Sequence, residues 1–257
     1  MLAPRPDLVA RAVQEGSFPR MLYKYRAVDK FTESIFSQRQ LWFASLNSFN
    51  DPFDCRIYDK GGYSTAQVMK YLQSQGMDPV EASTYVLQQA NDPGFIDGIL
   101  SNARDTVFKK WGILCLSRKR DDVLMWSHYC ASHTGFVIGF DVLKCPEFFC
   151  IPLNVTYSKD YPMFAYLEES EKIVAHGIAI KSKQWEYEEE VRIMKEPSGL
   201  HKFSGDCLTQ VIFGCRMPDN SKNQVLAHIH DYNFKHVEIW EAACSRKSYV
   251  LELHRVS

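Results

Sequence analysis

GILCLSRKRDDVLMWSHYCASHTGFVIGFDV, residues 112–142, opens the part of the chain in which strand patterns dominate. GILCLS and GFVIGFDV are short apolar runs bounded by polar segments, which is typical of buried strands. The intervening DVLMWSHYCAS predicts a short helix or turn. This stretch therefore predicts two strands joined through a short polar and aromatic connection.

Strand patterns also lie on both sides of that stretch. MLYKYRAV (21–28) and LWFAS (41–45) precede it, and EEEVRIMKE (188–196) and LTQVIFG (208–214) follow it. Because the strands rarely alternate strictly with helices, the order predicts an α+β fold with a mixed or antiparallel sheet. Helical spacing of apolar residues covers residues 64–110, which we interpret as a helical insertion within a single domain spanning residues 1–257.

The composition is that of a globular protein, with 46% apolar and 24% charged residues and a net charge of -1. This charge gives no indication of a nucleic-acid or anionic-membrane partner. The eight cysteines form no C-x-x-C pair, so we expect no structural zinc site. We also expect no bound cofactor. Without an apolar signal core or a membrane-length apolar run, we expect a cytoplasmic protein with reduced thiols. Its oligomeric state is left open.

The strongest candidate site is QWEYEEEVRIMKEP, residues 184–197. If residues 187–194 form a strand, two carboxylates and a guanidinium share one face, with a tryptophan just before them. These residues are Trp185, Glu188, Glu190 and Arg192. A carboxylate there could stabilise a developing cation or bind a sugar hydroxyl. The alternative is a solvated strand face with a weak ion pair.

A second candidate is LMWSHYCASHTGFVIGFD, residues 124–141, which gathers Trp126, His128, Tyr129 and His133. Such side chains could bind a phosphate or orient a ring, and His128 could act as an acid or base near neutral pH. The alternative is a partly buried histidine beside a packed tryptophan.

Two further segments are candidates for ligand contacts. SLNSFNDPFD, residues 45–54, could place hydrogen bonds from Asn50 and Asp51, although turn chemistry also explains these residues. In LYKYR, a strand would direct Lys24 and Arg26 to one face, where they would suit a phosphate or carboxylate. A plain amphipathic edge strand is the alternative.

These four segments, in this order, resemble the bacterial family called "domain of unknown function 2971". The motifs that carry the resemblance are LYKYR, LWFASLNSFNDPFD, ILCLS followed by LMWSHYCASHTGFVIGFD, and WEYEEEVRI. The likeness extends from about Leu22 to about Gly214. It implies a fold grouping and leaves the activity open.

EEEVRIMKEP also resembles the E-x-E strand of ADP-ribosyltransferases. This second resemblance implies that Glu190 is the catalytic carboxylate and Glu188 an accessory one. It also implies that Lys24 or Arg26 takes the first-strand role in binding NAD, and that Ser45 holds the nicotinamide ribose. Here the second strand reads WFASLNS, which departs from the S-T-S pattern of that superfamily.

Together these patterns predict a nucleotide-directed enzyme, either an ADP-ribosyltransferase or an NAD glycohydrolase, in a toxin or phage-defence setting. NAD would be the substrate. One alternative is a nonenzymatic regulatory module that binds a nucleotide or a protein. Another is a metal-dependent nuclease that uses Asp51, Asp54, Glu188 and Glu190.

Overall fold

The computed structural model describes residues 5–55, 58–89, 94–95, 98–99, 101–102, 109–150, 152–165, 167 and 177–256. The chain divides into two compact units. The first, here called the sheet unit, comprises Met1–Ala44, Gly112–Val155 and Gln184–Ser257; the second comprises Ser45–Trp111 and Thr156–Lys183. Each unit is described by itself, and the single-domain organisation stays a prediction.

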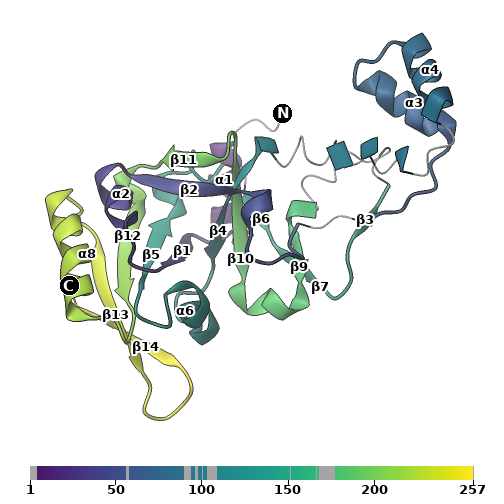
Figure 1. The fold of residues 1–257 in the computed structure, drawn as a ribbon. Coiled ribbons are helices and arrows are strands. Elements are labelled where there is room, and N and C mark those ends of the chain that lie inside the picture. Colours follow the sequence, from purple (N-terminus) through teal and green to yellow (C-terminus); the bar gives the residue numbers. More distant parts are fainter. Residues whose placement is uncertain are drawn as a thin grey trace. The chain divides into compact units, whose positions relative to one another are not determined.

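A ten-stranded sheet dominates the sheet unit (Figure 1). Its strands are β1 (Met21–Arg26), β2 (Gln40–Ser45), β4 (Gly112–Ser117), β5 (Phe136–Asp141), β6 (Pro152–Asn154), β10 (Glu190–Lys195), β11 (Gly199–Lys202), β12 (Leu208–Phe213), β13 (Glu238–Cys244) and β14 (Leu251–Arg255). The order is β11-β2-β4-β1-β5-β12-β13-β14, and β10 pairs with β4 and β6. The β12–β13 pair is parallel, whereas β1 runs antiparallel to β4 and β5, and β10 antiparallel to β4. The sheet is thus mixed and mostly antiparallel, which confirms the predicted α+β class.

Side chains alternate between the two faces of this sheet, so apolar residues point to both faces and helices pack against them. The helices of the sheet unit are α1 (Pro6–Gln14), α2 (Thr32–Ser37), α6 (Val123–Tyr129) and α8 (Asp219–Asp231). Short 3-10 helices lie at η2 (Val142–Lys144), η3 (Lys183–Glu188) and η4 (Gly205–Cys207). The larger core cluster joins α2 and α8 to Leu22, Ile138 and Val191. A second cluster joins α6 to Tyr23 and Tyr25. The alternation expected for residues 22–26 is therefore confirmed.

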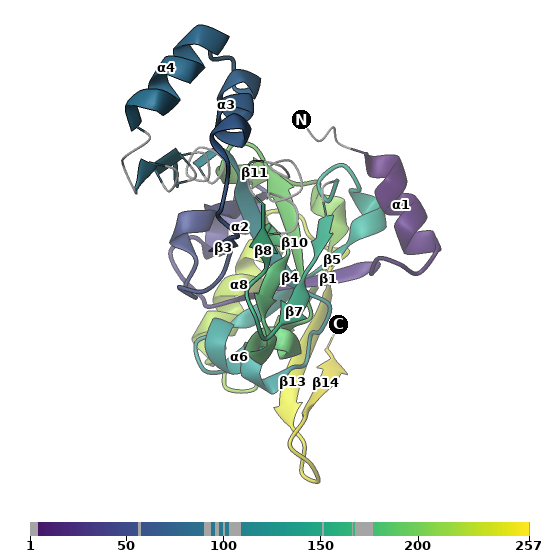
Figure 2. The ribbon, with the colours of Figure 1, turned by 90° about the vertical axis from the view of Figure 1, so that its right-hand side faces the viewer.

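The β13–β14 hairpin extends beyond the rest of the sheet, with its connecting loop projecting in both views (Figure 2). Tyr249, in that loop, is fully exposed. Residues 238–241 of β13 pair in parallel with β12, and residues 240–244 pair antiparallel with β14. The end of β13 therefore leaves the sheet as part of the hairpin.

The second unit holds the predicted helical segment. It contains η1 (Leu46–Ser48), β3 (Tyr58–Asp59), α3 (Thr65–Ser74), α4 (Pro79–Gln89), β7 (Thr156–Ser158), β8 (Met163–Phe164) and β9 (Ile180–Ser182). β3 pairs with β8 and β7 with β9, both in parallel. Ser64 is the N-cap of α3 and forms a reciprocal capping box with Gln67. Much of residues 90–108 lies outside the described residues. Among the described helices, none is long and apolar enough to cross a membrane.

Candidate functional site

The candidate site in the sheet unit begins at the start of β10. The sequence predicts a strand from residue 187, but β10 begins at Glu190, and Glu188 ends the 3-10 helix η3. The cause is local: Glu189 has φ +42, a left-handed conformation that interrupts an extended strand. Glu190 and Arg192 still share a face, opposite Ser117 and Cys115 of β4.

Glu190 and Arg192 form a buried, two-point ion pair. Arg192 Nε donates to Glu190 Oε1 at 2.9 Å, and Arg192 Nη2 donates to Oε2 at 3.1 Å. Arg192 is 0% exposed and Glu190 is 4% exposed. Two parallel bonds suit a planar guanidinium and a carboxylate, and each buried charge needs the other. The alternative of a solvated strand face is therefore wrong for these two residues.

Glu188 contacts a different group of residues. The Tyr129 hydroxyl donates to Glu188 Oε1 at 2.6 Å, which joins α6 to η3. The Ser117 hydroxyl donates to the Glu188 backbone carbonyl at 2.6 Å and accepts the Lys119 N–H at 3.0 Å. Ser117 is buried at the end of β4. These bonds fix both the backbone and the carboxylate of Glu188.

Four rings surround this contact, and we call them the aromatic cluster: His128, Tyr129, Trp185 and Tyr187. The His128 ring centroid lies 6.3 Å from that of Tyr129, 6.2 Å from that of Trp185 and 6.4 Å from that of Tyr187. The Trp185 and Tyr187 centroids are 6.0 Å apart. His128 is exposed and the other three are half-buried. Rings that keep part of their surface open can stack on a planar ligand.

Trp126 of α6 stacks with His133, which lies in the loop after that helix. Trp126 is fully buried, meets the Tyr25 ring edge-on at 5.6 Å, and donates its indole N–H to the Arg120 carbonyl at 3.1 Å. His133 lies parallel to Trp126, and its Nε2 is 2.9 Å from the Ser127 hydroxyl. Burial, with a smaller contribution from Arg216, lowers the pKa of His133. This arrangement matches the alternative of a histidine beside a packed tryptophan.

Lys24 contacts the strand that pairs with β10. Its ammonium donates to the Cys115 carbonyl at 2.9 Å. Lys24 is only partly buried as a whole, but its amino group is enclosed, and this burial lowers the pKa of Lys24. Burial also raises the pKa of the Cys115 thiol, so this cysteine stays protonated at neutral pH. Lys24 thus contacts the backbone of Cys115 in β4. Cys115 pairs with Arg192 of β10.

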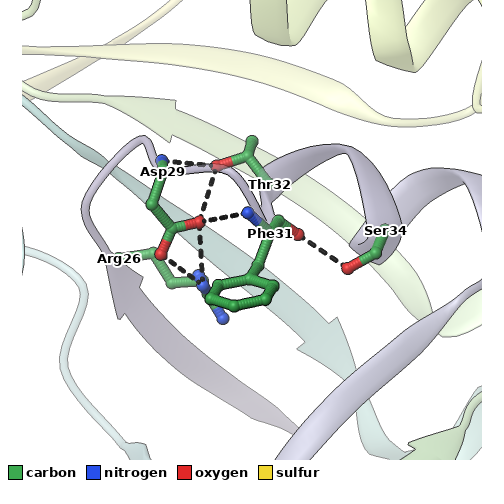
Figure 3. A network of polar contacts seen from close by, with 5 residues as sticks. All are labelled: Arg26, Asp29, Phe31, Thr32 and Ser34. Carbon is green, nitrogen blue, oxygen red and sulfur yellow. Dashed lines mark hydrogen bonds and ion pairs between the residues drawn. The ribbon is translucent and has the colours of Figure 1, made fainter.

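Arg26 belongs to a separate polar network (Figure 3). Its Nη2 lies 3.1 Å from Asp29 Oδ2, and Asp29 Oδ1 accepts the Phe31 N–H at 2.9 Å. The Thr32 hydroxyl accepts the Asp29 N–H at 2.9 Å. Arg26 therefore stabilises the turn that leads from β1 into α2. Its predicted role in binding a ligand stays a prediction.

Ser45 ends β2 and is the first residue of the second unit, which also contains Asn50 and Asp51. Asp51 is buried, and its carboxylate accepts the Phe53 N–H at 2.8 Å, as expected from turn chemistry. The Ser45 carbonyl accepts the Ser48 hydroxyl at 2.7 Å, and Asn50 is exposed. Their roles in ligand binding stay predictions. In the described part of the chain, no three or more His, Cys, Asp or Glu side chains gather as a metal site.

Sequence patterns did not single out Ser117 or Tyr187, which contact or adjoin Glu188. Ser117 is the last residue of an apolar strand pattern, so its hydroxyl carried no separate signal. Tyr187 stands between two glutamates, and its place in the aromatic cluster depends on the 3-10 turn of η3. The missed residues are thus those whose contacts depend on how η3 meets β4 and α6.

The fold and site define an α+β protein with a mixed sheet and a carboxylate held among aromatic rings. Residues 125–193 match the family model described as "Protein of unknown function (DUF2971)", which confirms the resemblance to that family. The matched range begins within α6 and ends within β10, so it includes the whole aromatic cluster. Neither a curated protein nor a solved structure matches the chain. The resemblance to ADP-ribosyltransferases stays a prediction.

Proposed function

We propose that this protein is a nucleotide-directed enzyme that cleaves an N-glycosidic bond, with NAD as the first substrate to test. The observation that carries the proposal is the 2.6 Å hydrogen bond from Tyr129 to Glu188 within the aromatic cluster. It holds a carboxylate beside rings that could bind a base. The transferase and hydrolase forms of this reaction share the same bond cleavage and differ in the acceptor.

The aromatic cluster supports binding of a planar ring. The ring centroids of His128, Trp185 and Tyr187 lie 6.0–6.4 Å apart, and each side chain keeps part of its surface exposed. Stacking on such side chains contributes about 1–3 kcal/mol per base. Lys119, ion-paired with Glu189 at 2.9 Å, adds a cation beside the same turn. A phosphate could replace that carboxylate partner without leaving the ammonium uncompensated.

The chemistry of glycosidic cleavage suits a fixed carboxylate. As the C–N bond breaks, positive charge develops on the ribose, and a preorganised anion stabilises it. Between the two candidate carboxylates we favour Glu188, because Tyr129 links it to the aromatic cluster. Both Glu190 oxygens accept hydrogen bonds from Arg192, which gives Glu190 a structural role. The alternative is that Glu190 is the catalytic carboxylate, and the test below distinguishes the two residues.

The test is to incubate the purified protein with NAD and to measure free nicotinamide. We expect release by the wild-type protein and a loss of about 10²–10³-fold in rate for Glu188→Gln, since one charge-stabilising group is removed. Glu189→Gln is the matched control, because it removes a neighbouring carboxylate that pairs with Lys119 instead. Both variants need an unchanged thermal unfolding profile.

Three results would change the assignment. Full activity of Glu188→Gln would remove this residue from the mechanism. A folded Glu190→Gln variant that alone loses turnover would return the catalytic role to Glu190. If no nicotinamide is released but NAD raises the melting temperature, the protein binds the nucleotide without cleaving it, as in the regulatory-module alternative.

A further inference from the structure

Two cysteines outside the aromatic cluster, Cys215 and Cys244, lie within reach of each other. The Sγ atoms of Cys215 and Cys244 are 3.8 Å apart. Cys244 ends β13 and is exposed, whereas Cys215 follows β12 and is half-buried. A disulfide requires sulfurs about 2.05 Å apart. The two sulfurs must therefore approach each other by about 1.8 Å to form the bond.

The sheet register explains why the thiols meet. In the parallel β12–β13 pair, Phe213 lies opposite Glu241. Cys215 follows Phe213 by two positions and Cys244 follows Glu241 by three. Neighbouring strands run about 4.8 Å apart, so positions offset by one residue remain adjacent just beyond the pairing. The proximity is therefore built into the backbone and does not depend on a mobile terminus.

We propose that Cys215 and Cys244 form an intramolecular disulfide when the protein meets a low-molecular-weight disulfide such as oxidised glutathione. The exposed Cys244 thiolate attacks one sulfur of the glutathione disulfide, and one glutathione thiolate leaves. The Cys215 thiolate then attacks the Cys244 sulfur, and the second glutathione leaves. The two protons lost by the cysteines end on the two glutathione thiols, and the cysteine pair is oxidised by two electrons.

The protein environment favours this order of events. Cys244 is accessible, whereas burial, together with a hydrogen bond to Cys244, raises the pKa of Cys215. The exposed thiol therefore meets the reagent first, and the second step speeds up as the pH rises toward the pKa of Cys215. Cys145 and Cys207 are both buried, so the same reagent has little access to them.

The link would join the hairpin to the turn after β12. That turn contacts the loop after α6, because the Gly214 N–H donates to the Gly135 carbonyl at 3.0 Å and the Arg216 N–H to the His133 carbonyl at 3.1 Å. The closed loop, residues 215–244, would contain α8 and nearly all of β13. A cross-link of this length restricts the unfolded chain and raises the melting temperature by about 5–10 °C.

The experiment treats the folded, full-length protein with oxidised glutathione and follows its intact mass. We expect the loss of two hydrogen atoms, a peptide that joins residues 215 and 244, and a melting temperature that rises and returns after reduction with dithiothreitol. Cys244→Ser and Cys215→Ser should each abolish the link and the thermal shift. Cys207→Ser, the control, changes a buried cysteine and should keep both.

Three outcomes would overturn the proposal. One is a glutathionyl group that stays on Cys244 without resolution. Another is a cross-link that persists in Cys244→Ser, because other cysteines would then form it. The third is a wild-type protein whose mass is unchanged at alkaline pH. Cys244→Ser changes an exposed residue, and Cys215→Ser serves as a second variant if the first fails to fold.

Discussion

Glu188 and Glu190 are two residues apart and occupy different environments. Glu190 extends from a strand into a buried ion pair with Arg192, whereas Glu188 ends a 3-10 helix and meets the Tyr129 hydroxyl. The single left-handed residue between them, Glu189, accounts for the change in backbone direction. Two identical side chains, both buried, thus acquire different partners through one backbone dihedral: Glu190 pairs with Arg192, and Glu188 accepts a hydrogen bond from Tyr129.

The largest effect should come from breaking the buried pair. Glu190→Gln leaves the Arg192 guanidinium enclosed without its counter-charge, which costs about 3–5 kcal/mol of unfolding free energy. Urea unfolding followed by circular dichroism would measure this. The double variant Glu190→Gln with Arg192→Met should recover much of the loss, because both members of the buried ion pair are then removed. A single variant as stable as wild type would show that Glu190 is not structural.

A smaller loss should follow from removing the bond that holds Glu188. Tyr129→Phe keeps the ring but deletes a hydrogen bond to a charged group, worth about 1.5–3 kcal/mol. The same urea titration would report it. Tyr249→Phe is the matched control, since it removes the same atom from a fully exposed side chain. Equal stabilities for the two variants would mean that the Tyr129 bond contributes nothing.

His133 should make a weaker, pH-dependent contribution. Its pKa is lowered by burial from 6.5, so the folded protein binds this proton less readily than the unfolded chain. Its contribution is therefore fully present above pH 6.5 and is lost as the pH falls through the lowered pKa. We expect less than about 1 kcal/mol, because solvent screens a partly exposed ring. His133→Asn should flatten the stability difference between pH 8 and pH 5; an unchanged slope would contradict this.

The sequence predicts the position of a side chain where local strand alternation determines it, and fails where a backbone turn or a distant contact does. Local alternation was enough to place Tyr23 and Tyr25 on one face and Val191 in the core, because a strand has period two. The same rule placed Glu190 with Arg192. It failed at Glu188, because a left-handed Glu189 leaves no trace in a pattern of charges.

Contacts between distant segments were harder to predict. The sequence grouped His128 and Tyr129 and, separately, Trp185 and Glu188, but only the fold joins η3 to α6. The sequence predicted that Arg26 could bind an anionic ligand. In the structure its charge is compensated by Asp29, three positions later. The sequence left Asp51 open as a ligand contact or a turn residue. Its hydrogen bond from the Phe53 N–H is the one expected of a turn residue. Short polar motifs therefore indicated candidate segments, but they did not predict the contacts between them.

The smallest effect on stability should come from the exposed ring of the aromatic cluster. His128→Ala removes a side chain that solvent already reaches, so the unfolding free energy should change by no more than about 0.5 kcal/mol. Loss of a stacking partner should nevertheless weaken NAD binding about tenfold, as measured by calorimetry or by ligand-induced thermal stabilisation. A residue of a binding surface should affect affinity with little effect on stability, whereas a residue of a packed core should affect stability. If His128→Ala binds NAD as tightly as wild type, the aromatic cluster does not contact the base, and the contrast between Glu188 and Glu190 would be one of packing alone.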